Sequence, residues 1–399
     1  MKNSRLGFWP TFRPAFRPAF RPAFRPAFRP AFRLTFRLTF RSASRLVFRL
    51  IFRLIFRLIF RLIFSLIFLF LMVSCSQKQN TITFEAMNTY MTIKSFGKTP
   101  VRANKLAKSQ IQNMEALLSA TNPQSEVFRL NSSEKNEQEV SPVLSEVLGF
   151  SLDIATLTDG AFNPCLYPIT KEWGFTTQNY KVPSKLLIEK LLLYTDYEKA
   201  CVQAFKLTKA DKMEFDFGGV GKGFAGDEAI KTLLQNGVTS AILDLGGNIQ
   251  LLGSKPDGSD WTIGLRNPWE AGAQPVLSLK ISDCAVITSG GYERFFTGDD
   301  GRRYIHIFDS KTGFPVDNGI ASVTVICKEG RLGDALSTAL FAMGKEKAVD
   351  FWKSNKAAFD FDMIIIFENK TILYTKGLSQ KLSLLFDFTQ VDKIDIEQK

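Results

Sequence analysis

Histidine and cysteine are both scarce in this chain of 399 residues, and their scarcity excludes several kinds of site. The only histidine is His306, so a metal centre built from several imidazoles is excluded, and every serine would compete for that one imidazole in a serine–histidine–aspartate set. The five cysteines show neither the spacing of metal ligands nor a dense disulfide pattern. Four of them are expected to be small buried residues: Cys165, Cys201, Cys284 and Cys327.

Acidic residues are absent before Glu85, and the basic residues that fill this region distort the overall charge. The net charge of the whole chain is +12, but 15 of its 51 basic residues precede Cys75. The remainder holds 36 basic and 39 acidic residues, which is a net charge of −3. A mildly acidic folded part gives no reason to propose a nucleic-acid partner.

The N-terminal leader is a tetrapeptide repeat over residues 11–64, first FRPA, then FRLT, then FRLI. Proline at every fourth position prevents both helix and sheet in the FRPA part, whereas the FRLI part is compatible with a helix carrying an arginine stripe. We expect residues 1–61 to be a disordered low-complexity segment, or a translated tandem repeat from upstream of the true start. A basic segment that lies on a membrane surface is the functional alternative.

Residues 62–75 have the pattern of a lipoprotein signal. The charges stop after Arg61, and the 13 residues that follow are apolar, which is shorter than the roughly 20 needed to span a bilayer. Met72-Val73-Ser74-Cys75 resembles a bacterial lipobox, with Met72 in place of the usual leucine. We therefore expect a lipidated Cys75, a tether over residues 76–83, and an exported domain that is anchored to the membrane and faces the periplasm. An unprocessed membrane anchor is the alternative.

Residues 84–399 mix helical and strand patterns without strict alternation, which predicts an α+β fold with mixed or antiparallel sheets and packed helices. Helices are expected at 101–118, 142–157, 182–193 and 332–343, and between the glycine-rich turn and Gly237. Strands are expected at 84–96 with a turn at Asn88, and at 240–245, 261–266, 276–281, 285–289, 304–308, 321–327, 363–367 and 371–374.

A glycine-rich turn precedes the helix that ends at Gly237, and its glycines are Gly218, Gly219, Gly221 and Gly223. Glycines before a helix allow the backbone and the free N–H groups of the helix N-terminus to approach an anion. The spacing fits neither the phosphate loop nor the dinucleotide fingerprint. A tight turn packed on a sheet is the structural alternative.

Asp334, Ser337 and Thr338 share one face of a predicted helix, because they are spaced i, i+3 and i+4. Oxygen-only ligands suit a hard cation such as Mg²⁺. The alternative is that Asp334 only stabilises the helix dipole. His306, in a strand-like segment, is either a proton donor or acceptor or a packed, hydrogen-bonded residue.

Eight segments, taken in order, resemble the ApbE-type flavin transferases, once called thiamine-biosynthesis lipoproteins. The resemblance covers about residues 84–352. The segments are AMNT (86–89), SATNPQSEVFRLN (119–131), TDGAFNPCLYPITKEWGF (158–175), DFGGVGKGFAGDEA (216–229), AILDLGGNI (241–249), AVITSGGYERFF (285–296), RRYIHIFDSKTGFPV (302–316) and GDALSTALFAMG (333–344).

The resemblance implies an Mg²⁺-dependent FAD:protein FMN transferase with an α+β fold. Such an enzyme cleaves FAD at its pyrophosphate, passes FMN to a threonine or serine hydroxyl of an acceptor flavoprotein, and releases AMP. The implied acceptors are subunits of membrane redox complexes, such as sodium-pumping NADH:quinone oxidoreductase or Rnf-type complexes. The alternatives are an FAD pyrophosphatase that yields FMN and AMP, and a non-catalytic flavin-binding lipoprotein.

The resemblance also assigns residues. Asp334, Thr338 and the backbone carbonyl of Gly221 match the family's metal ligands, and His306 with Asp334 matches its catalytic groups. The implied FAD contacts are Met87, Ala161, Phe162, Asn163, Gly218, Phe224, Phe308 and Ser337. The chain departs from the family pattern at three positions: Asn163 replaces an aspartate, Thr121 an aromatic residue and Asn88 a glycine.

Overall fold

The computed structural model describes residues 50–64 and 78–395, and the expected lipobox with Cys75 lies outside these ranges. The chain divides into two compact units, Met1–Ser76 and Gln77–Lys399. In the first unit, residues 50–64 form a helix, with which the FRLI part of the repeat is compatible. The FRLI repeat contains no proline, which permits the helix. No helix among the described residues is long and apolar enough to cross a membrane.

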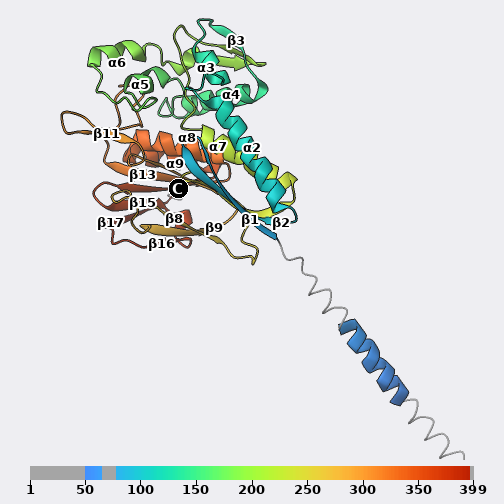
Figure 1. The fold of residues 1–399 in the computed structure, drawn as a ribbon. Coiled ribbons are helices and arrows are strands. Elements are labelled where there is room, and N and C mark those ends of the chain that lie inside the picture. Colours follow the sequence, from blue (N-terminus) through green and yellow to red (C-terminus); the bar gives the residue numbers. More distant parts are fainter. Residues whose placement is uncertain (1–49, 65–77, 396–399) are drawn as a thin grey trace, which may run out of the picture. The chain divides into compact units, whose positions relative to one another are not determined.

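A nine-stranded sheet forms the centre of the second unit (Figure 1). Neighbouring strands are antiparallel except β15 and β17, which are parallel, so the expected α+β fold with a mixed sheet is confirmed. In spatial order the strands are β1 (Lys78–Ala86), β2 (Thr89–Gly97), β6 (Val238–Asp244), β7 (Asn248–Leu252), β10 (Ala285–Gly290), β13 (Ile320–Cys327), β14 (Asp362–Phe367), β15 (Thr371–Thr375) and β17 (Gln390–Ile394).

The sheet is covered on both faces, because its central strands carry apolar side chains on both. Along β14, Met363 and Ile365 belong to the cluster under the helices, whereas Ile364 and Ile366 belong to the cluster on the other face. The helical layer contains α2 (Pro100–Leu118), α7 (Gly221–Gln235), α8 (Gly330–Met343) and α9 (Lys345–Phe359). The other face packs against a second sheet of β8 (Trp261–Leu265), β9 (Leu277–Ile281) and β16 (Leu382–Leu384).

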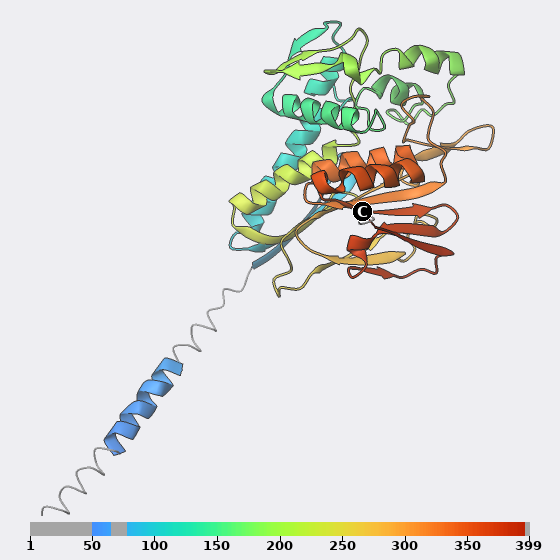
Figure 2. The same ribbon diagram turned by 180° about the vertical axis from the view of Figure 1, so that it is seen from behind.

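A further group of short elements lies beyond the helical layer, as Figure 2 shows from behind. It shares a core with α7, since Leu144, Val147 and Leu148 pack in the same cluster as Phe217 and Phe224. The group consists of α3 (Glu126–Asn131), α4 (Pro142–Leu157), α5 (Tyr167–Glu172), α6 (Lys185–Leu192), the 3-10 helix η1 (Tyr197–Lys199), and a sheet of β3 (Glu137–Glu139), β5 (Lys206–Thr208) and β4 (Cys201–Gln203). The remaining elements are the hairpin of β11 (Phe295–Thr297) and β12 (Arg303–Ile305) and the 3-10 helix η2 (Lys376–Leu378).

One expectation about the elements needs correction, and one helix was not expected. β1 already begins at Lys78, so residues 78–83 are strand rather than tether; this edge strand exposes its polar side chains and therefore lacks an apolar signature. The expected strand pattern at 84–96 with a turn at Asn88 is confirmed, because β1 and β2 form a hairpin whose turn is Met87–Asn88. The second helix after β13, α9, was not foreseen, because only Ala348 and Trp352 of it are buried.

Candidate active site at the crossing of α7 and α8

The helices α7 and α8 cross in very close contact near their N-termini. A Cβ atom on Gly223 would lie 2.4 Å from the carbonyl oxygen of Gly330 and 2.6 Å from the Cα atom of Arg331. Real Cβ atoms do not approach backbone atoms so closely, so this crossing requires glycine at position 223. The glycine-rich turn thus brings the first turn of α7 against the first turn of α8.

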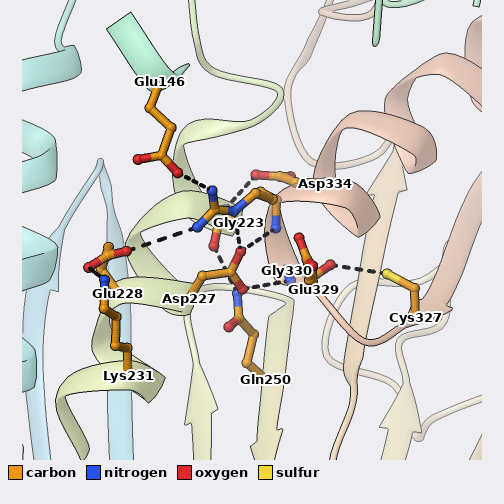
Figure 3. A network of polar contacts seen from close by, with 11 residues as sticks. Glu146, Gly223, Asp227, Glu228, Lys231, Gln250, Cys327, Glu329, Gly330 and Asp334 are labelled. Atoms are coloured by element: carbon orange, nitrogen blue, oxygen red, sulfur yellow. Dashed lines mark hydrogen bonds and ion pairs between the residues drawn. The ribbon is translucent and has the colours of Figure 1, made fainter. Parts of the chain in front are cut away.

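Each of the two helices is capped by a carboxylate from the other (Figure 3). Asp334 of α8 accepts a hydrogen bond from the backbone N–H of Gly223 at 2.8 Å. In return, Asp227 of α7 accepts from the backbone N–H groups of Gly330 at 2.7 Å and Arg331 at 3.0 Å. Neither helix has a side-chain cap of its own, so the first-turn N–H groups are satisfied across the crossing.

The cap on α8 is reinforced by an ion pair. The Nε atom of Arg331 donates to Asp227 at 2.9 Å, and its Nη1 atom donates to Glu146 of α4 at 2.6 Å. The guanidinium also lies 4.2 Å from the centre of the Phe224 ring. Burial raises the pKa of Asp227 in spite of the neighbouring Arg331, which means that desolvation outweighs the ion pair for this carboxylate.

Hydroxyl groups surround Asp334 on the same face of α8, as the spacing in the sequence predicts. Ser337 and Thr338 donate to the backbone carbonyl of Asp334 at 3.0 and 3.2 Å. Ser289, from β10, lies 2.8 Å from the Ser337 hydroxyl and 3.3 Å from that of Thr338. Gly219 lies on the other side of Thr338, since a Cβ atom there would be 3.3 Å from its Oγ1 atom.

Asp334 is almost completely buried, with 5% of its surface exposed. Burial raises the pKa of its carboxyl group, while Lys222, the N–H of Gly223 and the amide of Asn248 oppose this shift. Among the described residues, no group of three or more His, Cys, Asp and Glu could hold a metal ion. A divalent cation at Asp334 would therefore depend on hydroxyl and carbonyl oxygens, which suit Mg²⁺ rather than zinc.

His306 is partly buried and its tautomer is set by the backbone. Its Nδ1 atom lies 3.1 Å from the carbonyl oxygen of Arg294, which can only accept, so Nδ1 carries the proton and Nε2 offers a lone pair. Burial, together with the charges of Arg294 and Lys222, lowers the pKa of His306 to about 4. The imidazole is therefore neutral at pH 7 and is available as a base.

A cleft of ≈ 1250 Å³ opens beside the N-terminus of α7. Gly221 and Lys222 of the first turn of α7 line it, and so do two other cationic residues, Arg266 and Arg294. Among the residues that the structure describes, none of these three cations has an acidic group within ion-pair distance. Four carboxylates also line the cleft, and the charges of all three cations act on one of them, Glu293. Cations beside a helix N-terminus attract an anion such as a pyrophosphate.

The cleft gathers some of the residues that the resemblance assigned to FAD. Met87 and Gly218 line it. Met87 and Asn88 form the turn of the β1–β2 hairpin with φ angles of 49° and 58°, so Asn88 takes a left-handed conformation that suits the usual glycine and that asparagine tolerates. Thr121 also lines the cleft.

The other residues assigned to FAD are not among those that line the cleft. Phe162 is 4% exposed and packs on Gly219, and Phe224 packs edge-on against Phe150 of α4. Phe308 is buried in an aromatic cluster around Trp173. Ala161 is partly buried against the same core as Phe162, and Ser337 lies in the hydroxyl cluster. Their roles toward FAD remain predictions.

Asn163, the residue that replaces an aspartate, holds the backbone in place. Its Oδ1 atom accepts from the N–H of Cys165 at 2.8 Å, and its Nδ2 atom donates to the carbonyl of Thr195 at 2.9 Å. An aspartate could make only the first of these two contacts when ionised. Asparagine at position 163 therefore holds two backbone segments that an ionised aspartate could not both bind.

Sequence reasoning missed several residues of the site. Lys222 lies within the glycine-rich turn, where a single lysine gives no signal of an anion site. Arg266 follows β8, and Arg294 follows a turn after β10, so nothing in their local sequence indicates that they share a cleft with α7. Asn248 and Asp227 likewise lie within motifs whose local sequence does not show that they reach the start of α8.

Comparison with known proteins identifies the family. The model of the ApbE family matches residues 87–361. A protein of Treponema pallidum named FAD:protein FMN transferase is 30% identical over 321 residues, which cover 75% of this chain and 87% of that protein. A protein of the same name from Klebsiella pneumoniae is 30% identical over 285 residues, covering 70% of this chain and 87% of that protein.

Solved structures agree as well. The crystal structure of the ApbE protein from Thermotoga maritima has a TM-score of 0.71 at 28% identity, covering 76% of this chain and 99% of that one. The apo form of the flavinyl transferase ApbE from Pseudomonas stutzeri has a TM-score of 0.68 at 26% identity, covering 77% and 98%. On these matches, and with its motifs gathered around one helix crossing and cleft, the chain belongs to the ApbE family.

Proposed function

We propose that this chain is an FAD:protein FMN transferase that requires Mg²⁺, releases AMP, and attaches FMN to a threonine or serine hydroxyl of an acceptor flavoprotein. The relatives named above support the activity. The observation that carries the finer statement is the opening of the first turn of α7 into the cleft. That turn lines the cleft through Gly221 and Lys222, and it is held by Asp334 through Gly223.

The residues of the site fit a divalent cation. Asp334, the Thr338 hydroxyl and the carbonyl of Gly221 would hold Mg²⁺, and the unpartnered buried amide of Asn248 marks the same place as polar. Bound there, Mg²⁺ would supply charge neutralisation for a pyrophosphate. The first turn of α7 and the side chain of Lys222 bind and orient the same anion, which limits the directions from which an acceptor can approach.

The transfer needs a base for the acceptor hydroxyl, and His306 is suited to that task because it is neutral with an open Nε2 atom. The acceptor oxygen forms a bond to the phosphorus of the FMN moiety. The bond from that phosphorus to the bridging oxygen breaks, and AMP leaves with the electron pair. The hydroxyl proton passes to Nε2 of His306. Phosphoryl transfer of this kind depends more on positioning and charge than on covalent help from the protein.

We also propose that the domain works outside the cytoplasm on a membrane. The signal-like residues 62–75 and the lipobox at Cys75 support export and lipid anchoring. Acceptor subunits of membrane redox complexes, such as sodium-pumping NADH:quinone oxidoreductase or Rnf-type complexes, would then be within reach. The sequence offers no support for a nucleic-acid partner, since the part after the leader is mildly acidic.

The test is to incubate the purified chain with FAD and Mg²⁺, with and without a protein domain that bears an acceptor threonine. AMP release and the mass of the acceptor are followed together. An Mg²⁺-dependent gain in acceptor mass equal to FMN is the expected result, and Asp334→Ala should remove it while keeping the fold. AMP release without an adduct would instead indicate an FAD pyrophosphatase. Bound FAD with neither product would indicate a non-catalytic flavin-binding lipoprotein.

A further inference from the structure

Asn248 carries a buried amide with no hydrogen-bond partner. It is the first residue of β7, in the middle of the nine-stranded sheet, where its Cα atom pairs with that of Ile287 of β10. Its side chain is 2% exposed, and neither its Oδ1 nor its Nδ2 atom is hydrogen-bonded within the described part of the chain. A buried amide that loses its hydrogen bonds to water without gaining a protein partner destabilises the fold. Its presence indicates a ligand or a second state of the site in which the amide has a partner.

The next residue on the same face of β7 makes the contrast clear. Gln250 lies two positions further along the strand, so its side chain points to the same side as that of Asn248. Its Nε2 atom donates to the carbonyl of Gly223 at 3.1 Å. A Cβ atom on Gly226 or Gly330 would lie 2.1 or 1.8 Å from this Nε2 atom, so two glycines make room for the amide. β7 thus directs two amides at the α7–α8 crossing, and only one of them is satisfied.

The neighbour of the unsatisfied amide is Asp334. Ile287, the Cα partner of Asn248 in β10, packs against the first turns of α8, since a Cβ atom on Gly333 would lie 2.7 Å from its Cγ1 atom. Paired residues of neighbouring strands point to the same face of the sheet, so the amide of Asn248 also points toward the start of α8, where Asp334 follows Gly333. One oxygen of that carboxylate, Oδ2, already accepts from the N–H of Gly223. A second donor is therefore poised next to a carboxylate that a single backbone N–H holds.

We propose that Asn248 is a positioning residue of the cation site: its amide donates to Asp334 when a divalent cation binds, and so fixes the carboxylate in the direction that faces Thr338. The inference rests on the Mg²⁺ site of the proposed function. Without the cation, the unpartnered amide lowers the free energy of unfolding. When the cation binds, the amide forms its hydrogen bond to Asp334 and this loss of stability is removed. Buried polar groups without partners are expected at functional sites, where residues that serve the function can lower the stability of the fold.

The test separates cation binding from stability. Mn²⁺ binding to the purified full chain is measured by electron paramagnetic resonance without FAD, and urea unfolding is measured without any divalent cation. Asn248→Leu keeps the size and removes both amide atoms. It should leave cation-free stability unchanged or higher, and weaken Mn²⁺ binding at least tenfold. Equal Mn²⁺ affinity in this variant and in the wild type would overturn the inference, and so would a loss of cation-free stability.

Ser151→Ala is the matched control. Ser151 of α4 is fully buried and its hydroxyl also lacks a partner, but α4 carries none of the cation ligands. Its loss should leave Mn²⁺ affinity unchanged and should not reduce stability. If Ser151→Ala weakened Mn²⁺ binding as much as Asn248→Leu, the loss of affinity would follow from removing any unpartnered buried polar group. The inference would then be rejected.

A second variant tests the role of the N–H group itself. Asn248→Asp has no side-chain N–H and adds a negative charge beside Asp334, so it should also weaken Mn²⁺ binding. Tighter binding in Asn248→Asp would mean that position 248 ligates the cation directly, which contradicts a positioning role. If the wild type itself does not bind Mn²⁺, the cation site of the proposed function fails. If the wild type binds and Asp334→Ala does not, a failure at position 248 concerns this inference alone.

Discussion

Replacing Asp227 by asparagine should destabilise the protein much more than neutralising Glu146, the most exposed of the three carboxylates that pair with Arg331. Asp227 and Arg331 are 15% and 18% exposed, and Asp227 accepts three hydrogen bonds, two of them from the N-terminus of α8. Asparagine can still accept from Gly330, but it cannot neutralise the guanidinium. Glu146, the outer partner of Arg331, is 59% exposed.

The size of the effect follows from what each change leaves behind. Removing one partner of a buried ion pair costs roughly 3–5 kcal/mol, because the remaining charge is uncompensated. Since Glu146 still contacts Arg331, we expect Asp227→Asn to cost about 3 kcal/mol, at the lower end of that range. An exposed ion pair contributes about 0–1 kcal/mol, so Glu146→Gln should cost less than about 1 kcal/mol.

Urea unfolding followed by circular dichroism measures both values, with the wild type as reference and the denaturant slope checked for constancy. Because the Asp227 cap and the Asp334 cap lie in one crossing, Asp227→Asn should also weaken the Mg²⁺ dependence of turnover, whereas Glu146→Gln should not. Equal destabilisation by the two variants would refute the reasoning. It would show that the buried, capping carboxylate of Asp227 stabilises the protein no more than the exposed carboxylate of Glu146.

Three further predictions concern single positions. The pKa of His306 is lowered to about 4, so between about pH 4 and 6.5 the unfolded chain binds a proton that the folded chain does not, and the free energy of unfolding rises with pH over this range. His306→Gln should therefore make the melting temperature less dependent on pH between these values. An unchanged pH dependence of the melting temperature in this variant would exclude His306 as its source. Gly223→Ala should cost about 2 kcal/mol in urea unfolding, whereas Gly149→Ala in α4, whose Cβ atom would meet nothing closer than 3.6 Å, should stabilise by up to about 1 kcal/mol. Thr338→Val should reduce Mg²⁺-dependent turnover about tenfold, which corresponds to about 1.4 kcal/mol, and Ser337→Ala should reduce it less. A magnesium titration measures both variants. A larger loss of turnover in Ser337→Ala than in Thr338→Val would contradict the assignment of Thr338 as a cation ligand.

The elements that could be predicted from the sequence are those that bury one face, because their apolar residues then repeat at helical or strand spacing. α4 was predicted with the bounds 142–157 that it has, because Pro142 marks its first turn and its apolar residues repeat at helical spacing. α9 left no such pattern, since its sequence is rich in lysine and buries little. β17 pairs along the sheet edge with mostly exposed residues, and its parallel partner β15 gave no local signal of it.

The site shows the same division between local and long-range information. The shared face of Asp334 and Thr338 follows from helical geometry alone, and the sequence predicted it. The crossing that joins Asp334 to Gly223 spans 111 residues of sequence, and no local pattern encodes such a contact. Residue types at Lys222, Arg266 and Arg294 are ordinary surface types, so only the fold reveals that they face one cleft.

The reciprocal caps have a consequence for the order in which the chain folds. The amide of Gly223 is protected by a residue 111 positions away and that of Gly330 by one 103 positions away. Contacts of such long range form late and open only when a large part of the structure opens, so these two amides should exchange with deuterium together and at the slow rate of global unfolding. A nascent chain that has not yet reached α8 would hold α7 with an incomplete first turn and would lack the pocket for the anion. The domain would then begin to work on flavin only after its C-terminal half has been made and folded.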